Sequence, residues 1–544
     1  MKTDIPLLEK IIRLIYQHIN CYSNGEADNI LKGLHHILKR SVSFSAKNFD
    51  KMGLDEFQST LATINEKETR RKKDGVYYTP KDITEYIVTN AFLNYVYYDT
   101  LQVHPAKECI QYISADKVEK LLEAKVFDPT CGTAEFLISV VETKLTLLKT
   151  YREVCDADLV RIASATYGND ISADSVLLSK IRIYFIIISN LNDKTYCIRL
   201  AKILNKNFST NDYIVSIEKN KYDIIIGNPP YVEYGKLSKK PDSNYGNIYA
   251  DVLQNSIKAL KNGGIIGFVV PISFVATSRM EPIRNYVYHK MDKLFAMNFA
   301  DRPDCLFDGV HQKLTIILGG KGKNKCHVYS SSYYHWYHDE RQGLLDNCKI
   351  YPVIPETKYI PKIGDQYEYS IFTKIRKSTG TPLANLSCAD DDCDEIFLNM
   401  RACFWMKAFS FNPGSKEYKS IICTKEIKPY ILAILNSSLF FLYWTVVSDC
   451  WHITNKELLD FVIPLENVNF DRFRILIAKL ERKLEKTKKY IGSVQAQYEY
   501  KHRECKDEID AIDEALQEVY HLTDEEVSFL KEYKLRYRMS YGTI

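Results

Sequence analysis

The sequence lacks several features that would place a protein in a common class at once. Its 14 cysteines form no Cys-x-x-Cys pair, which argues against a zinc ribbon, and we predict free thiols and no metal site. The first residues, MKTD, are charged and contain no apolar signal-peptide core, which predicts a cytoplasmic protein. The net charge of +4 is small for 544 residues, so it neither requires nor excludes a nucleic-acid partner.

Long hydrophobic runs are also scarce. Only residues 430–447 approach the length of a membrane-spanning helix, and Asn436, Ser437 and Ser438 lie at the middle of this run, where they would be costly in lipid. We therefore predict a buried helix at this position and no contact with a membrane. The length of the chain predicts two to four domains.

The pattern of apolar residues divides the chain into four regions. Residues 1–70 have helical spacing, and the charge-dense run EKETRRKKD at 66–74 is a candidate linker. Residues 71–330 alternate short β-rich runs with amphipathic segments, which predicts an α/β domain with a mostly parallel, doubly wound sheet. Residues 331–465 predict an α+β domain, and residues 466–544 predict helices. In a doubly wound sheet, ligands bind beyond the carboxyl ends of the strands.

The most specific motif is a buried strand, Ile224–Ile226, that leads through Gly227 into Asn-Pro-Pro-Tyr at 228–231. The two prolines fix the backbone and remove two N–H donors. An amide oxygen, prolyl carbonyls and an aromatic ring remain, which suit an amino group on a flat heterocycle. Two acceptors can take its two N–H protons while the ring stacks, and the nitrogen lone pair then becomes available for attack on a methyl group.

Two acidic residues follow predicted strands upstream of this motif. Asp128 lies in a strand, turn and helix start, VFDPTCGTAEF, where it can accept a hydrogen bond from a cationic amine. Asp170 follows the next strand, a position that commonly binds ribose hydroxyls. Considered alone, the Asp128 segment could be a simple structural turn, and Asp170 could be a helix N-cap.

Together these motifs resemble the adenine-specific, amino-methylating DNA methyltransferases of the Taq-type and Eco57I-type branch. The family's Asn-Pro-Pro-Tyr is intact as Asn228, Pro229, Pro230 and Tyr231. The resemblance implies a Rossmann-like fold that binds S-adenosylmethionine and releases S-adenosylhomocysteine. It also implies that Asn228 and the Pro229 carbonyl hold the amino group of an adenine flipped out of double-stranded DNA, with Tyr231 stacked on the base.

The resemblance assigns the cofactor site to four segments. The segment GVYYTP at 75–80, the loop at 128–136, the residues that follow the second strand and an acidic-aromatic pair match the family. The implied cofactor-binding residues are Tyr77, Thr79, Pro80, Asp128, Pro129, Cys131, Gly132, Phe136, Asp170, Ile171, Asp212 and Tyr213. The loop departs from the family at Ala134, where a second glycine is usual.

The order of the motifs resembles that of family members whose target-recognition domain comes last, here residues 331–465. Phe307 or His311 is the implied second stacking residue for the base. The resemblance further implies a site-specific enzyme of a bacterial or archaeal restriction-modification or defence system. A separately encoded restriction endonuclease is a possible partner, and a monomer is favoured.

Two other functions stay open from the sequence. Protein-glutamine and ribosomal-RNA guanine methyltransferases also use Asn-Pro-Pro followed by an aromatic residue, but they usually lack the Tyr-Thr-Pro segment and this large C-terminal region. A non-catalytic DNA-recognition protein on a decayed methyltransferase fold is the second. A fused nuclease is not expected, because about 70 helical residues are too few for one and the Pro-Asp pairs at 241–242 and 303–304 lack an acidic-x-Lys partner.

Overall fold

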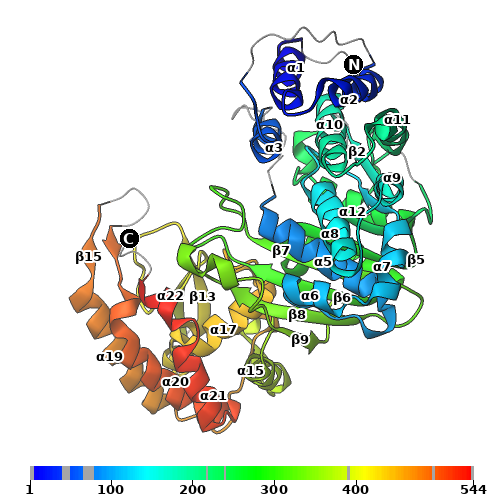
Figure 1. Ribbon diagram of the computed structural model, residues 1–544. Helices are drawn as coiled ribbons and strands as arrows, with labels where there is room; N and C mark the ends of the chain where they lie inside the picture. The colour runs from blue at the N-terminus through cyan, green and yellow to red at the C-terminus, as the bar shows by residue number, and fades with distance from the viewer. Residues whose placement is uncertain are drawn as a thin grey trace.

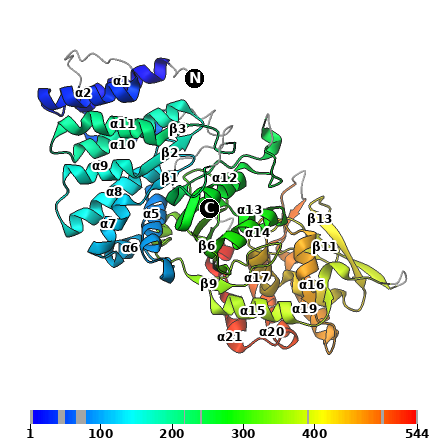
Figure 2. The same cartoon turned by 90° about the vertical axis from the view of Figure 1, so that its right-hand side faces the viewer.

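The computed structural model describes residues 5–39, 50–64, 79–215, 218–237, 241–388, 392–492 and 497–540. The predicted linker and most of the 75–80 segment, with Tyr77, lie outside these residues. Figure 1 and Figure 2 show the N-terminal helices at one end of the molecule and the C-terminal helices at the other. A large sheet lies between them.

Nine strands form this sheet in the order β3-β2-β1-β4-β5-β7-β6-β8-β9. Neighbouring strands from β3 to β5 are parallel, β7 is antiparallel to both β5 and β6, and β8 is parallel to β6. The prediction of an α/β fold with a mostly parallel sheet is confirmed. The strands are β1 Val126–Asp128, β2 Thr166–Asp170, β3 Phe208–Thr210, β4 Tyr222–Gly227, β5 Leu260–Pro271, β6 Met291–Phe299, β7 Leu314–Lys321, β8 His327–Tyr334 and β9 Ile350–Val353.

The sheet continues beyond the expected end of the α/β domain at residue 330. β8 crosses that position, and β9 pairs with β8 in antiparallel register. Backbone pairing at a sheet edge is not visible as a local pattern, because it depends on which strand lies beside it. We propose a domain boundary after Val353.

Helices that are apolar on most sides pack against the sheet. α8 contacts α5, α10, β1 and β2, while α12 contacts β5 and α14. Such burial explains the near-continuous apolar sequence of α10. The helices of this region are α5 Lys81–Val96, α6 Ala106–Tyr112, α7 Ala115–Glu123, α8 Glu135–Tyr151, α9 Asp156–Ser164, α10 Ala173–Ser189, α11 Cys197–Asn207, α12 Ile248–Ala259, α13 Ser273–Ala276 and α14 Glu281–Lys290.

The predicted N-terminal helices are α1 Ile5–Ile19, α2 Asn24–Leu38 and α3 Leu54–Thr63. α2 packs on α10 and α11 (Figure 2), and α3 packs on α10 (Figure 1). The hydroxyl of Tyr184 on α10 donates to the carbonyl of Ile30 at 2.9 Å. Gly33 permits this approach, because a Cβ at that position would lie 2.2 Å from the Tyr184 hydroxyl.

The C-terminal half combines short strands with helices. Its three-stranded sheet has the order β12-β11-β13 and is antiparallel. The elements are β10 Thr381–Pro382, β11 Cys393–Asn399, β12 Ala408–Phe409, β13 Tyr418–Thr424, β14 Val462–Ile463, β15 Lys489–Tyr490, β16 Tyr498–Glu499, α15 Gln366–Lys377, α16 Lys428–Asn436, α17 Ser438–Val447, α18 Asn455–Asp460, α19 Phe470–Thr487, α20 Lys506–Tyr520, α21 Asp524–Glu532 and α22 Leu535–Ser540.

The apolar run at 430–447 is buried, as predicted, but it forms two helices instead of one. α16 and α17 meet at Ser437 with a bend of 61°. The Ser437 hydroxyl accepts from the Phe440 N–H, so it caps the second helix. Within the described residues, no single helix has the length and apolar character to cross a membrane, whereas this bent pair meets both criteria together.

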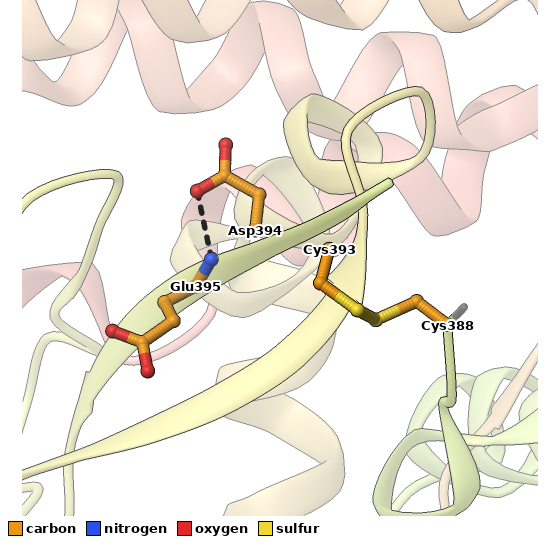
Figure 3. The surroundings of a disulfide bond; sticks show 4 residues. All are labelled: Cys388, Cys393, Asp394 and Glu395. Carbon is orange, nitrogen blue, oxygen red and sulfur yellow. Dashed lines mark hydrogen bonds between the residues drawn. A yellow bond between two sulfur atoms is a disulfide. The ribbon is translucent and has the colours of Figure 1, made fainter. Parts of the chain in front are cut away.

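One pair of cysteines departs from the prediction of free thiols. Cys388 and Cys393 form a disulfide at the start of β11 (Figure 3). The prediction rested on the absence of Cys-x-x-Cys pairs. These two cysteines are five residues apart, and the chain between them turns so that their Cα atoms lie 5.5 Å apart, within disulfide range. The other cysteines are free thiols.

Candidate active site

The carboxyl ends of β1, β2, β3, β4, β5 and β6 lie at one edge of the sheet, because these strands share a direction. β1 and β4 are neighbours at the point where the chain order reverses. Loops that leave two such strands diverge and form a crevice for a ligand. The sequence-predicted loops after β1, β2, β3 and β4 therefore all start at this edge.

The loop after β1 has the backbone shape that its sequence suggested. Gly132 and Ala134 both adopt left-handed conformations, with φ of 52° and 77°. Ala134 thus occupies the position where the resembling family has glycine, and glycine is favoured there because it has no Cβ to clash. Cys131 and Phe136 of the same loop are buried, as is Pro129.

Asn169 ties this loop to the next two strands. Its side-chain amide donates to the carbonyls of Pro129 and Asn211, both at 3.0 Å, and its oxygen accepts from the Ser209 hydroxyl at 2.8 Å. The backbone carbonyl of Asn169 accepts from the Cys131 N–H at 2.8 Å. Sequence reasoning did not select this residue, although it lies beside Asp170 in the same short motif.

Asp170 joins the loops after β1 and β2. Its carboxylate accepts from the N–H groups of Gly132 at 3.0 Å and Ser172 at 2.8 Å. Burial raises its pKa above the usual aspartate value. The adjacent Ile171 is exposed and leaves one apolar side chain at the surface of the crevice.

The predicted pair after β3 separates in the structure. Asp212 is exposed and its carboxylate accepts from the Ile214 N–H at 3.0 Å. Tyr213 instead points into the core, where its ring lies 5.6 Å from that of Phe127. Both residues lie in the turn beyond the end of β3 at Thr210, where no strand alternation sets the direction of their side chains.

Arg182 on α10 holds the loop after β1 from outside. Its guanidinium donates to the Thr133 carbonyl at 2.6 Å and forms an ion pair with Glu135. It also bonds the side chain of Gln58 on α3 at 3.1 Å. α3 therefore supports the loop after β1 through Arg182, a role for which the sequence carries no local signal.

The Asn-Pro-Pro-Tyr segment lies directly against the loop after β1. Gly227 ends β4 beside β1, and a Cβ at this position would lie 2.7 Å from the Asp128 carboxylate. Asn228 follows, and its amide N–H donates to the Thr79 hydroxyl at 3.2 Å. The absence of a side chain at Gly227 thus lets the two predicted sites share one crevice, a role that the sequence reasoning did not assign to this glycine.

Tyr231 folds back onto Asn228. Its hydroxyl lies 2.5 Å from the Asn228 Oδ1 and 3.1 Å from the Val269 carbonyl, and its ring meets the edge of the buried Tyr249. Pro229 is buried, while Pro230 and Tyr231 are partly exposed. The hydroxyl therefore occupies the acceptor that a bound amino group would use.

The remaining predicted residues lie around the same edge. Thr79 is buried and Pro80 is partly exposed at the start of α5. Phe307, in the loop between β6 and β7, is 1% exposed, so its ring is covered by protein in this conformation. His311 of the same loop is exposed and its ring nitrogen lies 3.1 Å from the Asp301 carbonyl.

The side chains of the crevice fit S-adenosylmethionine. The hydroxyl oxygen of Thr130 is buried and has no hydrogen-bond partner in the structure, which points to a ligand at the loop. Asp128 and Asp170 supply acidic acceptors for an ammonium group and ribose hydroxyls. Among the described residues, no cluster of histidine, cysteine, aspartate or glutamate could hold a metal ion.

Residues 164–301 match the family described as Eco57I restriction-modification methylase. The Type II methyltransferase M.HincII of Haemophilus influenzae is 33% identical over 138 residues, which cover 22% of this chain and 27% of M.HincII. These matches support the predicted DNA methyltransferase family.

Other restriction-modification proteins align over longer stretches. Modification methylase CviBIII of Paramecium bursaria Chlorella virus NC1A is 22% identical over 345 residues, which cover 63% of this chain and 67% of that protein. The solved structure of the Type IIL restriction-modification enzyme MmeI in complex with DNA has a TM-score of 0.49 and 12% identity, and the match covers 90% of this chain and 82% of MmeI. The chain spans about a quarter of the length of the Haemophilus influenzae relatives it matches, 27% and 26%.

Asp128→Asn should stabilise the cofactor-free methyltransferase at alkaline pH. Burial, with a smaller contribution from the nearby Asp170, raises the pKa of Asp128 from 3.8 to about 8 despite a hydrogen bond from the Thr130 N–H at 3.0 Å, which lowers it. Between pH 3.8 and about 8 the folded state therefore holds a proton on Asp128 that the unfolded state has lost. The free energy of unfolding falls as pH rises through this range. Removing the charge should add about 1–3 kcal/mol near pH 8, measured as the unfolding free energy.

The same substitution should weaken cofactor binding. Asn cannot carry the negative charge that pairs with an ammonium group, so the affinity for S-adenosylmethionine should fall about tenfold. In the wild type this affinity should increase as pH rises through 8 and Asp128 ionises, and in Asp128→Asn this increase should be absent. Titration calorimetry at several pH values measures this, with Asp99→Asn, an exposed carboxyl outside the crevice, as the control. Equal pH slopes in the wild type and Asp128→Asn would contradict the assignment.

Proposed function

We propose that this chain is a site-specific DNA adenine-N6 methyltransferase that acts on an adenine flipped out of double-stranded DNA. The observation that carries the proposal is the contact between the Asn-Pro-Pro-Tyr motif and the cofactor loop, where Asp128 packs against Gly227 next to Asn228. It puts acceptors for an amino group beside acceptors for a cofactor in a single crevice. The companion endonuclease and a role in restriction-modification follow as part of the proposal from the family.

S-adenosylmethionine, when bound, supplies an electrophilic methyl group. Asp128 and Thr130 are suited to its methionine portion, Asp170 to its ribose and Asp212 to its adenine. The protein contributes positioning, because a displacement reaction of this kind needs the attacking nitrogen held in line with the methyl group. Asn169 and Arg182 keep the cofactor loop in a fixed shape for this purpose.

The Asn228 amide is suited to hold the target nitrogen. Its N–H donates to Thr79, which orients Oδ1 toward the opening that Tyr231 covers. Oδ1 and the Pro229 carbonyl then accept the two N–H protons of the adenine amino group, and the nitrogen lone pair is freed for attack. Because the Tyr231 hydroxyl occupies Oδ1 in this conformation, the base must displace it, and the tyrosine ring becomes free to stack.

Methyl transfer from labelled S-adenosylmethionine to unmethylated DNA tests the proposal. Digestion of the product and mass spectrometry should identify N6-methyladenine. N4-methylcytosine would overturn the choice of base. Transfer to a protein glutamine or to ribosomal RNA, with none to DNA, would support the alternative methyltransferases, and cofactor binding without transfer to any of these substrates would support a non-catalytic protein.

A further inference from the structure

A short helix in the C-terminal half of the chain reaches the start of α5. This 3-10 helix, η5 His338–Gly343, follows β8, whose carboxyl end lies at the same sheet edge as the crevice. Arg341 extends from it and forms a bidentate pair with Asp82, Nε to Oδ2 at 2.7 Å and Nη2 to Oδ1 at 3.0 Å. The two residues are 259 positions apart in the sequence.

The same guanidinium also holds the loop between β6 and β7. Its Nη1 donates to the Leu306 carbonyl at 3.0 Å, directly before Phe307. His338 of the same short helix pairs with Asp304 of this loop at 3.1 Å. One arginine therefore connects the beginning of α5 with the loop that carries the predicted stacking residues.

Asp82 lies in the first turn of α5, three residues after Thr79. Its carboxylate also accepts from the Ile83 N–H at 2.9 Å, so the pair with Arg341 fixes the direction in which the helix begins. Thr79 in turn accepts from the Asn228 amide. The contacts thus run from Arg341 through Asp82 and the first turn to the catalytic amide.

The short helix is itself held from the C-terminal side. Glu340 accepts from the Tyr337 N–H at 2.8 Å and from the Tyr537 hydroxyl at 3.2 Å, and it forms an ion pair with Arg536. The Arg536 guanidinium stacks over Tyr337 at 5.2 Å. Contacts with α22 therefore hold the short helix from which Arg341 projects, and the pair has bidentate geometry although the Asp82 side chain is 42% exposed.

We propose that Arg341 is a positioning residue that couples the cofactor side of the crevice to the base side. It sets the Thr79–Pro80 segment against Asn228 and the cofactor, and it sets the Phe307 loop against the incoming base. These contacts require a guanidinium group, because only its planar set of N–H donors can form two hydrogen bonds to the Asp82 carboxylate and a third to the Leu306 carbonyl. Both sides of this inference rest on the proposed function, the cofactor side only on its binding of S-adenosylmethionine.

Two readouts on the full chain test the inference. The first is the dissociation constant of S-adenosylhomocysteine, which needs no DNA substrate. Arg341→Met should raise this dissociation constant about tenfold, which is the range for losing charge-assisted hydrogen bonds. Arg341→Lys should recover part of the lost affinity. The control is Arg376→Met, which likewise removes an arginine bonded to one carbonyl, that of Asp460, and to one carboxylate, that of Glu356.

The second readout is methyl transfer to unmethylated DNA. Arg341→Met should lower kcat and also raise KM for the cofactor, while thermal unfolding should shift no more than in Arg376→Met. Asp82→Asn should give similar losses, and the double variant should lose less than the two single losses combined, because both remove one interaction. Additive losses, or unchanged cofactor binding in Arg341→Met, would overturn the inference.

Failure of the proposed function is distinguishable from failure of the inference. If the wild-type chain binds S-adenosylhomocysteine but transfers no methyl group to DNA, the proposed function fails. The binding comparison of Arg341→Met, Arg341→Lys and Asp82→Asn still decides whether Arg341 positions the cofactor side.

Discussion

Asn228→Ala should abolish most methyl transfer while leaving the cofactor bound. The substitution removes the Oδ1 that is suited to accept from the target amine and the N–H that bonds Thr79. Loss of one preorganised hydrogen-bonding group from an active site lowers kcat by about 100- to 1,000-fold. Cofactor affinity should fall far less than kcat, because most of the groups suited to bind it lie on the loops after β1, β2 and β3, and only the bond to Thr79 is lost at the start of α5.

Initial rates with labelled S-adenosylmethionine measure the effect, and titration with S-adenosylhomocysteine measures cofactor affinity. Asn324→Ala is a matched control, since this exposed asparagine follows β7 at the opposite edge of the sheet. Its rate should equal that of the wild type. An Asn228→Ala enzyme with more than about a tenth of the wild-type kcat would contradict the assigned role.

Tyr231→Ala and Tyr231→Phe should differ sharply. Alanine removes the ring, and loss of one base–aromatic stack costs about 1–3 kcal/mol, so kcat/KM for DNA should fall about 5- to 150-fold. Phenylalanine keeps the ring and removes only the hydroxyl that bonds Asn228 Oδ1 at 2.5 Å. Its KM for DNA should be no higher than in the wild type, because the base no longer has to displace that hydroxyl.

Steady-state kinetics with unmethylated DNA separate the two effects, and cofactor affinity should be the same in both variants. If the phenylalanine variant loses as much activity as the alanine variant, the hydroxyl and not the ring is the functional group. If neither variant changes kcat/KM, Tyr231 does not contact the base.

The order of the motifs and their places beside strands were predictable from local patterns. Apolar runs of β type followed by polar turns marked β1, β2 and β4, and the structure places their carboxyl ends at one edge of the sheet. Such predictions succeed because a strand and its following turn are specified by short-range backbone preferences. The left-handed conformation of Ala134 also matches a position at which the family pattern has glycine.

Other features depend on packing between distant segments. The sequence predicted a similar role for Asp212 and Tyr213, yet one is exposed and the other is buried against Phe127. Phe307 or His311 was the implied second stacking residue, and in this conformation the Phe307 ring is covered while His311 is exposed. The disulfide between Cys388 and Cys393 was missed because a spacing of five residues does not specify whether two thiols approach each other.

The sequence by itself was enough to predict the fold class, the family resemblance and the residues that carry the proposed chemistry. These depend on the types of residues within short segments, which interact with their own backbone wherever the segment lies. Only the tertiary structure decided that Thr79 bonds Asn228, that Arg182 links Gln58 to the cofactor loop, and that Arg341 pairs with Asp82. Those partners are separated by 149, 124 and 259 residues, and contacts at such separations form only when particular faces of helices and strands pack together.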